Sequence, residues 1–269
     1  MPEEQLPQGV DPTVPSVARM YDYYLGGKDN FASDREAAEK FIEVVPSMRM
    51  IAQANRAFLR RAVTELAGQG IRQFLDIGSG LPTQENVHQV VHRIVPDAQV
   101  TYVDNDPIVL AHGRALLADN PYTTVIQADM REPKALLDHP EVRATIDFDR
   151  PVALILLAML HFVPQDDIAD TIVTSVREAL SPGSYLVLSH GFAGYSGQET
   201  QEKAQEVYVS TATGSITSRS PAQIAAYLEG LDVLPPGIVP VEAWRPEFDE
   251  DVPIDFTQPS ILGAVARLP

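Results

Sequence analysis

Residues 74–80 read Phe-Leu-Asp-Ile-Gly-Ser-Gly, and the interpretation of the whole chain starts from this stretch. A short run of strand type enters a turn with two glycines, and the apolar residues Val87 and Val90 follow at helical spacing. Glycines let the backbone approach a ligand closely, and amides exposed at a helix start favour an electron-rich or anionic group. The stretch therefore predicts a strand, a ligand-binding turn at Gly78, Ser79 and Gly80, and a helix over residues 83–95.

Outward from this turn, short apolar runs of strand type alternate with helical stretches, which is the pattern of a parallel sheet covered on both faces. We therefore expect an α/β fold, doubly wound around a mostly parallel seven-stranded sheet. Strands are expected at residues 74–77, 100–103, 124–126, 152–157, 185–188 and 261–267. Further helices are expected at residues 107–118, 165–180, 199–209 and 221–228.

The chain before the first strand has a different character. Residues 1–16 are polar and rich in proline, which predicts a flexible tail. Residues 17–70 are expected to form a lid and a helical cap, with helices over residues 34–45 and 48–67. The remaining residues, 71–269, are expected to form one ligand-binding domain.

Acidic residues follow three of the expected strands. Asp76 ends the first strand, Asp104 and Asn105 follow the second, and Asp129 and Met130 follow the third. Ligands of open α/β sheets bind at this edge, where an acid after the second strand accepts hydrogen bonds from ribose hydroxyls. Asp129 is suited to an adenine amino group, with Met130 against the base, and the alternative is that Asp129 only caps the next helix.

Two kinds of adenosine ligand fit this pattern, a dinucleotide and S-adenosylmethionine. A pyrophosphate turn needs a third glycine, where this chain has Thr83 preceded by Pro82. Asp76 would also repel a phosphate, whereas it suits the ammonium group of a methionyl moiety. The sequence therefore favours S-adenosylmethionine as the cofactor.

The amino-acid composition disfavours several classes of binding partner. Twenty Lys and Arg against 37 Asp and Glu give a net charge of −17, which disfavours nucleic acid and anionic membranes. The exception is a group of arginines at residues 49–61, which is interpreted as a solvated helix face. The chain has no cysteine, and His88 and His92 lack a third ligand, so no metal is expected. No signal peptide is recognised and the longest apolar run is too short to span a bilayer, which predicts a cytoplasmic protein.

The sequence resembles the actinobacterial S-adenosylmethionine-dependent methyltransferases formerly grouped as a domain of unknown function. The resemblance spans nearly the whole chain, and its motifs lie at residues 18–31, 55–56, 74–83, 86–88, 102–107, 109–112, 219–221, 240 and 244–246. It implies a class I methyltransferase fold with the cofactor held by Gly78, Ser79, Gly80, Asp104, Asn105, Asp129 and Met130. Pro82 departs from methyltransferases at large, where a third glycine is usual.

The resemblance also bears on the reacting end of the site. It marks residues 21–31 as a family motif, interpreted as a lid in which Gly27 allows a sharp turn and Tyr21 or Tyr24 lies near the methyl group. The alternative is that these residues only cover the core. In similar methyltransferases the end of the fourth strand faces the cofactor sulfur and the substrate, which makes Leu157 and Ala158 candidates for the cofactor wall. His161 is either a general base or a hydrogen-bonded structural residue.

These observations predict an S-adenosylmethionine-dependent methyltransferase that acts on a small molecule, with the cofactor in the domain of residues 71–269. Two alternatives stay open: a non-catalytic protein that binds S-adenosylmethionine or S-adenosylhomocysteine, and an NAD(P)-dependent reductase. The sequence leaves the acceptor and the oligomeric state open.

Overall fold

The computed structural model describes residues 9–82, 85–117, 120–195, 197–247, 252 and 254–269. Its strands are β1 (Gln73–Ile77), β2 (Gln99–Asp104), β3 (Thr123–Gln127), β4 (Ala153–Leu157), β5 (Tyr185–Phe192), β6 (Asp232–Val233), β7 (Val239–Pro240) and β8 (Ser260–Arg267). Its helices are α1 (Val17–Tyr24), α2 (Ala32–Val44), α3 (Met48–Gly68), α4 (Val87–Val91), α5 (Pro107–Leu117), α6 (Pro133–Leu137), α7 (Pro140–Thr145), α8 (Asp166–Ala179), α9 (Gln198–Tyr208) and α10 (Pro221–Tyr227), with short 3₁₀ turns η1 (Leu160–Phe162) and η2 (Val241–Ala243).

The sheet confirms the predicted α/β class. Its strand order is β3-β2-β1-β4-β5-β8-β6, with β1 to β5 parallel and β8 antiparallel to β5. In the described residues it has eight strands rather than the expected seven, because β6 and β7 pair with different parts of the same edge of β8. Pro235 and Pro236 lie between these two pieces. Since proline has no amide hydrogen to donate, it interrupts the edge strand.

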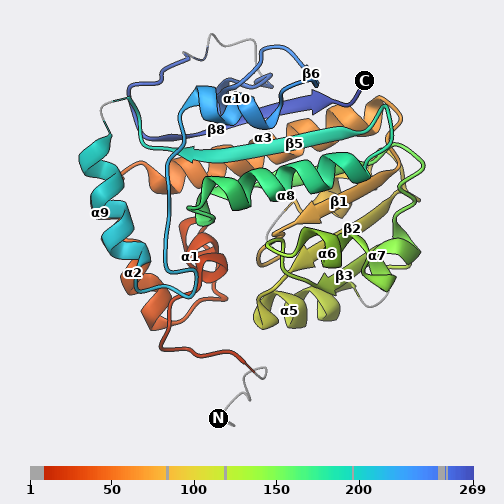
Figure 1. Cartoon of the computed structure of the whole chain (residues 1–269). Coiled ribbons are helices and arrows are strands. Elements are labelled where there is room, and N and C mark those ends of the chain that lie inside the picture. Colours follow the sequence, from red (N-terminus) through yellow and green to blue (C-terminus); the bar gives the residue numbers. More distant parts are fainter. Residues whose placement is uncertain (1–8, 83–84, 118–119, 196, 248–251, 253) are drawn as a thin grey trace.

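Helices cover both faces of the sheet, as α8 in front and α3 behind illustrate (Figure 1). Alternate side chains of a strand point to opposite faces. Leu154 and Leu156 of β4 therefore pack in the core beneath α6, α7, α8 and α10, whereas Ala153 and Ile155 pack in the core with α3 and α4. The two cores hold the sheet rigid and fix the positions of its strand ends.

The helix after the glycine turn begins later than predicted. We expected it at residue 83, whereas α4 begins at Val87, where Asn86 and Gln89 form a capping box. Residue 83 itself lies outside the described residues. A reciprocal capping box satisfies two amides at a helix start, so Asn86 fixes the beginning of α4. The glycine turn is consequently not the N-terminus of a helix.

A helical cap lies at one end of the sheet, on the side where β5 ends (Figure 1). It contains α2, close to the expected helix over residues 34–45, and α9 from late in the chain, which packs on α2. It also contains α1, where no helix was expected, whereas α3, expected as the second cap helix, packs on a face of the sheet. The rings of Phe41 and Tyr208 meet edge to face at 5.2 Å. Residues 9–16, expected as part of a tail, follow the surface, with the Pro15 carbonyl accepting from the Ala212 amide at 2.9 Å. Within the described residues no helix is long and apolar enough to cross a membrane.

Candidate functional site

A cavity of about 530 Å³ opens where β1, β2, β3 and β4 end, between the sheet and the cap. This volume lies in the range of ligand pockets. Nearly all of the predicted site residues line the cavity: Asp76, Gly78, Ser79, Gly80, Asp104, Asn105, Asp129, Met130, Leu157, Ala158, His161, Tyr21 and Tyr24. Gly27 is the exception. The predicted residues thus come from many separate segments and meet at one edge of the sheet.

Asp76 lies buried at the end of β1, and no described residue donates a hydrogen bond to its carboxylate. Burial raises the pKa of Asp76 to about 7, the nearby Arg56 guanidinium acts to lower it, and Asp104 acts to raise it further. Among the described residues the buried Nε of Arg56 also has no partner, while Nη2 of the same guanidinium donates to the Glu85 carbonyl and to Asn86. Asp76 and Arg56 therefore present opposite charges to the cavity, as the amino-acid part of S-adenosylmethionine requires.

Sequence reasoning missed Arg56. The interpretation of residues 49–61 as a solvated face suits Arg49, whose exposed side chain pairs with Glu39 at 2.8 Å. It is wrong for Arg56, which lines the cavity, and for Arg61, which donates to the carbonyls of Trp244 and Val241. The match of Asn55 and Arg56 to a family motif was the signal that pointed to this position.

The glycine turn was predicted to offer its amides to a ligand, but these amides are bonded within the protein. The amides of Gly78 and Ser79 donate to the Val103 carbonyl at 2.7 and 3.3 Å, and the Gly80 amide donates to Asp104 at 2.9 Å. Position 78 requires glycine for a different reason than ligand approach. Its φ is +77°, and a Cβ there would collide with the sulfur of Met159. The turn thus packs between the ends of β2 and β4.

Asp104 is buried at the end of β2 with both oxygens engaged. One accepts from the Gly80 amide, and the other accepts from the Asp106 amide at 3.0 Å. Burial raises the pKa of Asp104 to about 6, opposed by these backbone hydrogen bonds. Each carboxylate oxygen has a further lone pair, so Asp104 keeps the capacity to accept from ribose hydroxyls. Asn105, next in sequence, is exposed on the cavity side.

Asp129 is held by its neighbour Arg131 rather than by a helix. Its carboxylate accepts from the Arg131 amide at 2.9 Å and from the guanidinium, which lowers the pKa of Asp129. The alternative that Asp129 caps the next helix is wrong, because Glu132 occupies that position at α6. Asp129 and the half-buried Met130 remain on the cavity wall.

The end of β4 carries a backbone distortion. Ala158 has a φ of +55°, which is costly for a residue other than glycine. Its amide donates to Oγ of Ser189 at 3.0 Å, Ser189 donates to Asn55 at 2.8 Å, and Asn55 donates to the Tyr21 hydroxyl at 3.0 Å. A chain of hydrogen bonds thus links α1 to the strained residue at the end of β4, and no sequence pattern indicated it.

His161 is buried, and its Nδ1 accepts from the Gly191 amide at 3.0 Å. Burial lowers its pKa well below the usual value, with His190 and Arg219 acting in the same direction. A neutral imidazole that accepts at Nδ1 carries its proton on Nε2, where it can donate but not accept. This geometry favours the structural interpretation of His161 over the general base.

Only some of the predicted lid residues line the cavity. Tyr21 and Tyr24 of α1 line the cavity, whereas Gly27 lies outside it. Positive φ occurs at Gly26 and not at Gly27, where a Cβ would lie 1.9 Å from the Asp22 carboxylate. Asp22 accepts from the Asp29 amide and from Asn30, so the glycine makes room for a buried carboxylate. Gly27 shapes the loop that follows α1.

A mostly parallel sheet of this order, with β8 antiparallel and helices on both faces, is the class I methyltransferase fold. Its likeness to the N-methyltransferase NodS from Bradyrhizobium japonicum, solved with S-adenosylhomocysteine, lies in the fold (TM-score 0.50, 13% identity, 81% of this chain and 88% of that chain).

Residues 3–269 match the S-adenosyl methyltransferase family, and the chain belongs to it. It is therefore a methyltransferase that uses S-adenosylmethionine. The chain is similar to a DUF574 family protein from Streptomyces avermitilis (41% identity, TM-score 0.88, 96% of this chain and 99% of that chain). It is also similar to a proposed methyltransferase from Thermobifida fusca (40% identity, TM-score 0.89, 99% of each chain). No curated protein matches the sequence.

Proposed function

We propose that this enzyme holds S-adenosylmethionine along the ends of β1, β2 and β3 and methylates a small molecule bound beneath the cap. The observation that carries the proposal is that Asp76, Asp104 and Asp129, which follow three neighbouring strands, line the same cavity. The cavity continues past them to α1, α2 and α9, where an acceptor has room. A protein that only bound the cofactor would not need this extension.

The proposed cofactor contacts follow from charge and position. Asp76 holds the ammonium group and Arg56 the carboxylate of the methionyl part. Asp104 and Asn105 hold the ribose, and the adenine lies against Asp129 and Met130. The turn at residues 78–80 shapes the cavity between them. Leu157 and Ala158 form the wall next to the sulfonium, as the resemblance to related methyltransferases implies.

Bound S-adenosylmethionine supplies a methyl group that is already activated, so the protein mainly has to orient the acceptor and exclude water. The cofactor would give its methyl group to the acceptor nucleophile and leave as S-adenosylhomocysteine, and Asp76, Arg56 and Asp104 would hold it during the transfer. An oxygen or nitrogen acceptor also loses a proton to solvent. Tyr24 is the candidate to contact the acceptor, and His161 Nε2–H is suited to donate to it but not to act as a base.

We also propose that residues 17–31 form a lid whose closed state the cofactor stabilises. Tyr21 supports the closed position, because its hydroxyl donates to the Ala52 carbonyl and accepts from Asn55, and these two hydrogen bonds hold α1 against α3. Cleavage in residues 17–31 by a low dose of protease should slow when S-adenosylhomocysteine is added, since binding selects the closed state. Equal cleavage rates would reduce the segment to a structural wrap, as would full cofactor affinity after deletion of residues 1–31.

A cytoplasmic location and the exclusion of nucleic acid remain proposals that rest on the sequence. The net charge of −17 supports the second, because it opposes binding to a phosphate backbone.

The central experiment has two parts. Calorimetry on purified protein should show binding of S-adenosylmethionine and S-adenosylhomocysteine but not of NAD. Incubation with labelled S-adenosylmethionine and pools of small metabolites should then yield a labelled product. Binding of NAD alone would overturn the proposal, and cofactor binding without transfer to any pool would favour the non-catalytic alternative.

A further inference from the structure

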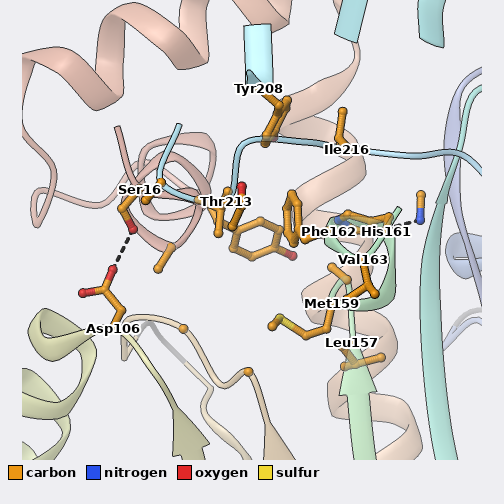
Figure 2. Close-up of a pocket in the computed structure, with 18 of the residues that line it drawn as sticks. Ser16, Asp106, Leu157, Met159, His161, Phe162, Val163, Tyr208, Thr213 and Ile216 are labelled. Carbon is orange, nitrogen blue, oxygen red and sulfur yellow. Dashed lines mark hydrogen bonds between the residues drawn. The ribbon is translucent and has the colours of Figure 1, made fainter. Parts of the chain in front are cut away.

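One end of the cavity is built from aromatic side chains that converge from four elements. These are Tyr24 of α1, Phe41 of α2, Phe162 of η1 and Tyr208 of α9, which we call the aromatic end. Ring centroids lie 6.3 Å apart for Tyr24 and Phe41 and 5.7 Å apart for Phe162 and Tyr208. Phe162, Tyr208 and Ile216 lie together across the cavity from Ser16 and Asp106 (Figure 2).

The aromatic end contains no charged side chain among the described residues. The Asp and Arg residues that line the cavity come from residues 11–19, from Arg56 and from the strand-end loops between residues 76 and 131. His161, next to Phe162, is kept neutral because burial lowers its pKa. A charged acceptor would lose its hydration here without gaining a counter-charge, which is costly. The surroundings therefore favour an uncharged molecule.

Tyr24 places a buried hydroxyl at this end of the cavity. Its side chain is 2% exposed, and its hydroxyl has no hydrogen-bond partner in the described part of the chain. The hydroxyls of Tyr24 and Tyr208 influence each other's pKa, but no hydrogen bond of acceptable geometry joins them. Burial raises the pKa of both groups, so both hydroxyls keep their protons. A buried hydroxyl without a partner is unfavourable, and a ligand that supplies one removes that cost.

Other tyrosine hydroxyls show the contrast. Tyr21 is paired with Ala52 and Asn55, Tyr102 with His88, and Tyr185 with Gln69. These three hydroxyls have protein partners, including that of Tyr21 at the cavity, whereas the hydroxyl of Tyr24 has none among the described residues.

We propose that the methyl acceptor is an uncharged aromatic molecule that lies against Phe162 and Tyr208 and forms a hydrogen bond with the hydroxyl of Tyr24. Flat rings suit these walls because aromatic side chains gain from stacked and edge-to-face contacts. Leu157, the last residue of β4, and Met159 line the same cavity, and the Phe162 amide donates to the Met159 carbonyl at 3.0 Å. This inference rests on the proposed function, which places the cofactor at the opposite, charged end.

The test uses 2-naphthol, naphthalene and 2-naphthoate as probes of the protein saturated with S-adenosylhomocysteine, with binding followed by fluorescence or ligand NMR. We expect 2-naphthol to bind and 2-naphthoate to bind at least tenfold more weakly. The change Tyr24→Phe keeps the ring and should weaken 2-naphthol by about 2- to 10-fold, the loss of one hydrogen bond. It should leave naphthalene and S-adenosylhomocysteine unchanged.

Tyr23→Phe is the matched control, because the Tyr23 hydroxyl donates to the exposed Glu39 at 2.5 Å and lies outside the cavity. Equal binding of naphthoate and naphthol would overturn the proposal, as would unchanged naphthol affinity in a folded Tyr24→Phe protein or an equal loss in Tyr23→Phe. If S-adenosylhomocysteine binds and no probe does, this inference fails alone. If S-adenosylhomocysteine itself does not bind, the proposed function fails first.

Discussion

The Gly80 amide donates a hydrogen bond of 2.9 Å to Oδ2 of Asp104, and this contact ties the glycine turn after β1 to the end of β2. The turn and the carboxylate therefore support each other, and Asp104 has both a structural and a binding role in the proposed site.

Replacing Asp104 by Ala should weaken S-adenosylhomocysteine binding by roughly 2 to 4 kcal/mol, because charge-assisted hydrogen bonds to the ribose are lost. Asp104→Asn should have a smaller effect, since it keeps one acceptor oxygen. Calorimetry measures both. Asp97→Ala, at an exposed acid away from the cavity, is the control and should not change affinity. A folded Asp104→Ala protein with native affinity would place the ribose elsewhere.

Cofactor affinity should depend on pH through Asp76. Its pKa is about 7, raised by burial, and only the ionised carboxylate attracts an ammonium group. S-adenosylhomocysteine affinity should therefore rise between pH 5.5 and 7.5, by up to about tenfold for each pH unit below the pKa. Asp76→Asn should bind weakly and lose most of this rise. An unchanged pH profile in the variant would assign the titration to another group, with Asp104 the next candidate.

The same carboxylate should destabilise the cofactor-free protein. Its pKa is about 7 in the folded state against 3.8 for the ordinary group, so the folded state binds more protons in that interval. Stability therefore falls as pH rises through the interval, by up to about 4 kcal/mol, and the full cost is present above it. Asp76→Asn should raise the Tm at pH 8 more than at pH 5. Equal shifts at both pH values would contradict a role for ionisation.

Gly27→Ala should destabilise the loop after α1, because the new Cβ would collide with the Asp22 carboxylate and break its hydrogen bonds to Asp29 and Asn30. Gly26→Ala is the matched control, since a Cβ there has open space and only the cost of a φ of +79°, about 1 kcal/mol. Thermal melts should show the larger loss for Gly27. A larger loss for Gly26→Ala would mean that the backbone conformation, and not the room for a Cβ, determines the loss of stability.

The buried ion pair of Arg19 and Asp34 should be a main support of the cap. Their atoms lie 2.7 Å apart, and Asp34 also accepts from the amides of Ser16 and Phe31. Asp34→Ala should cost about 3 to 5 kcal/mol of unfolding free energy, because it leaves Arg19 buried and unpaired. Glu36→Ala breaks an exposed pair on the same helix, with Lys40, and should leave the free energy of unfolding nearly unchanged. Similar losses in urea melts would contradict this ranking.

The strand ends could be predicted from the sequence because their signals are local. The apolar run before Asp76 and the acid after the next strand place both residues at the same edge of a parallel sheet. The order of the edge strands was harder, since the two-residue strands β6 and β7 are too short for a periodic signal. The sequence analysis therefore predicted seven strands, one fewer than the described sheet, in which β6 and β7 are separate.

The acceptor side could not be predicted in the same way. The residues of α9 give no local indication that the helix returns to α2, and only the fold brings Tyr208 to Phe41. Arg56 looked like any surface arginine because helical spacing alone cannot show which face meets a cavity. The amides of Gly78 and Ser79 were misassigned for a related reason, since their partner, the Val103 carbonyl, belongs to another strand.

The two ends of the cavity are encoded in different parts of the gene. Most of the proposed cofactor contacts come from residues 76–131, with Arg56, Leu157 and Ala158 outside this range, whereas the aromatic end comes from α1, α2, η1 and α9. Mutations in α9 can therefore change the acceptor during evolution while the methyl-donor half is inherited intact. An engineer has the same freedom: grafting α9 and its following loop from a relative exchanges one wall of the acceptor site without touching the three strand-end carboxylates.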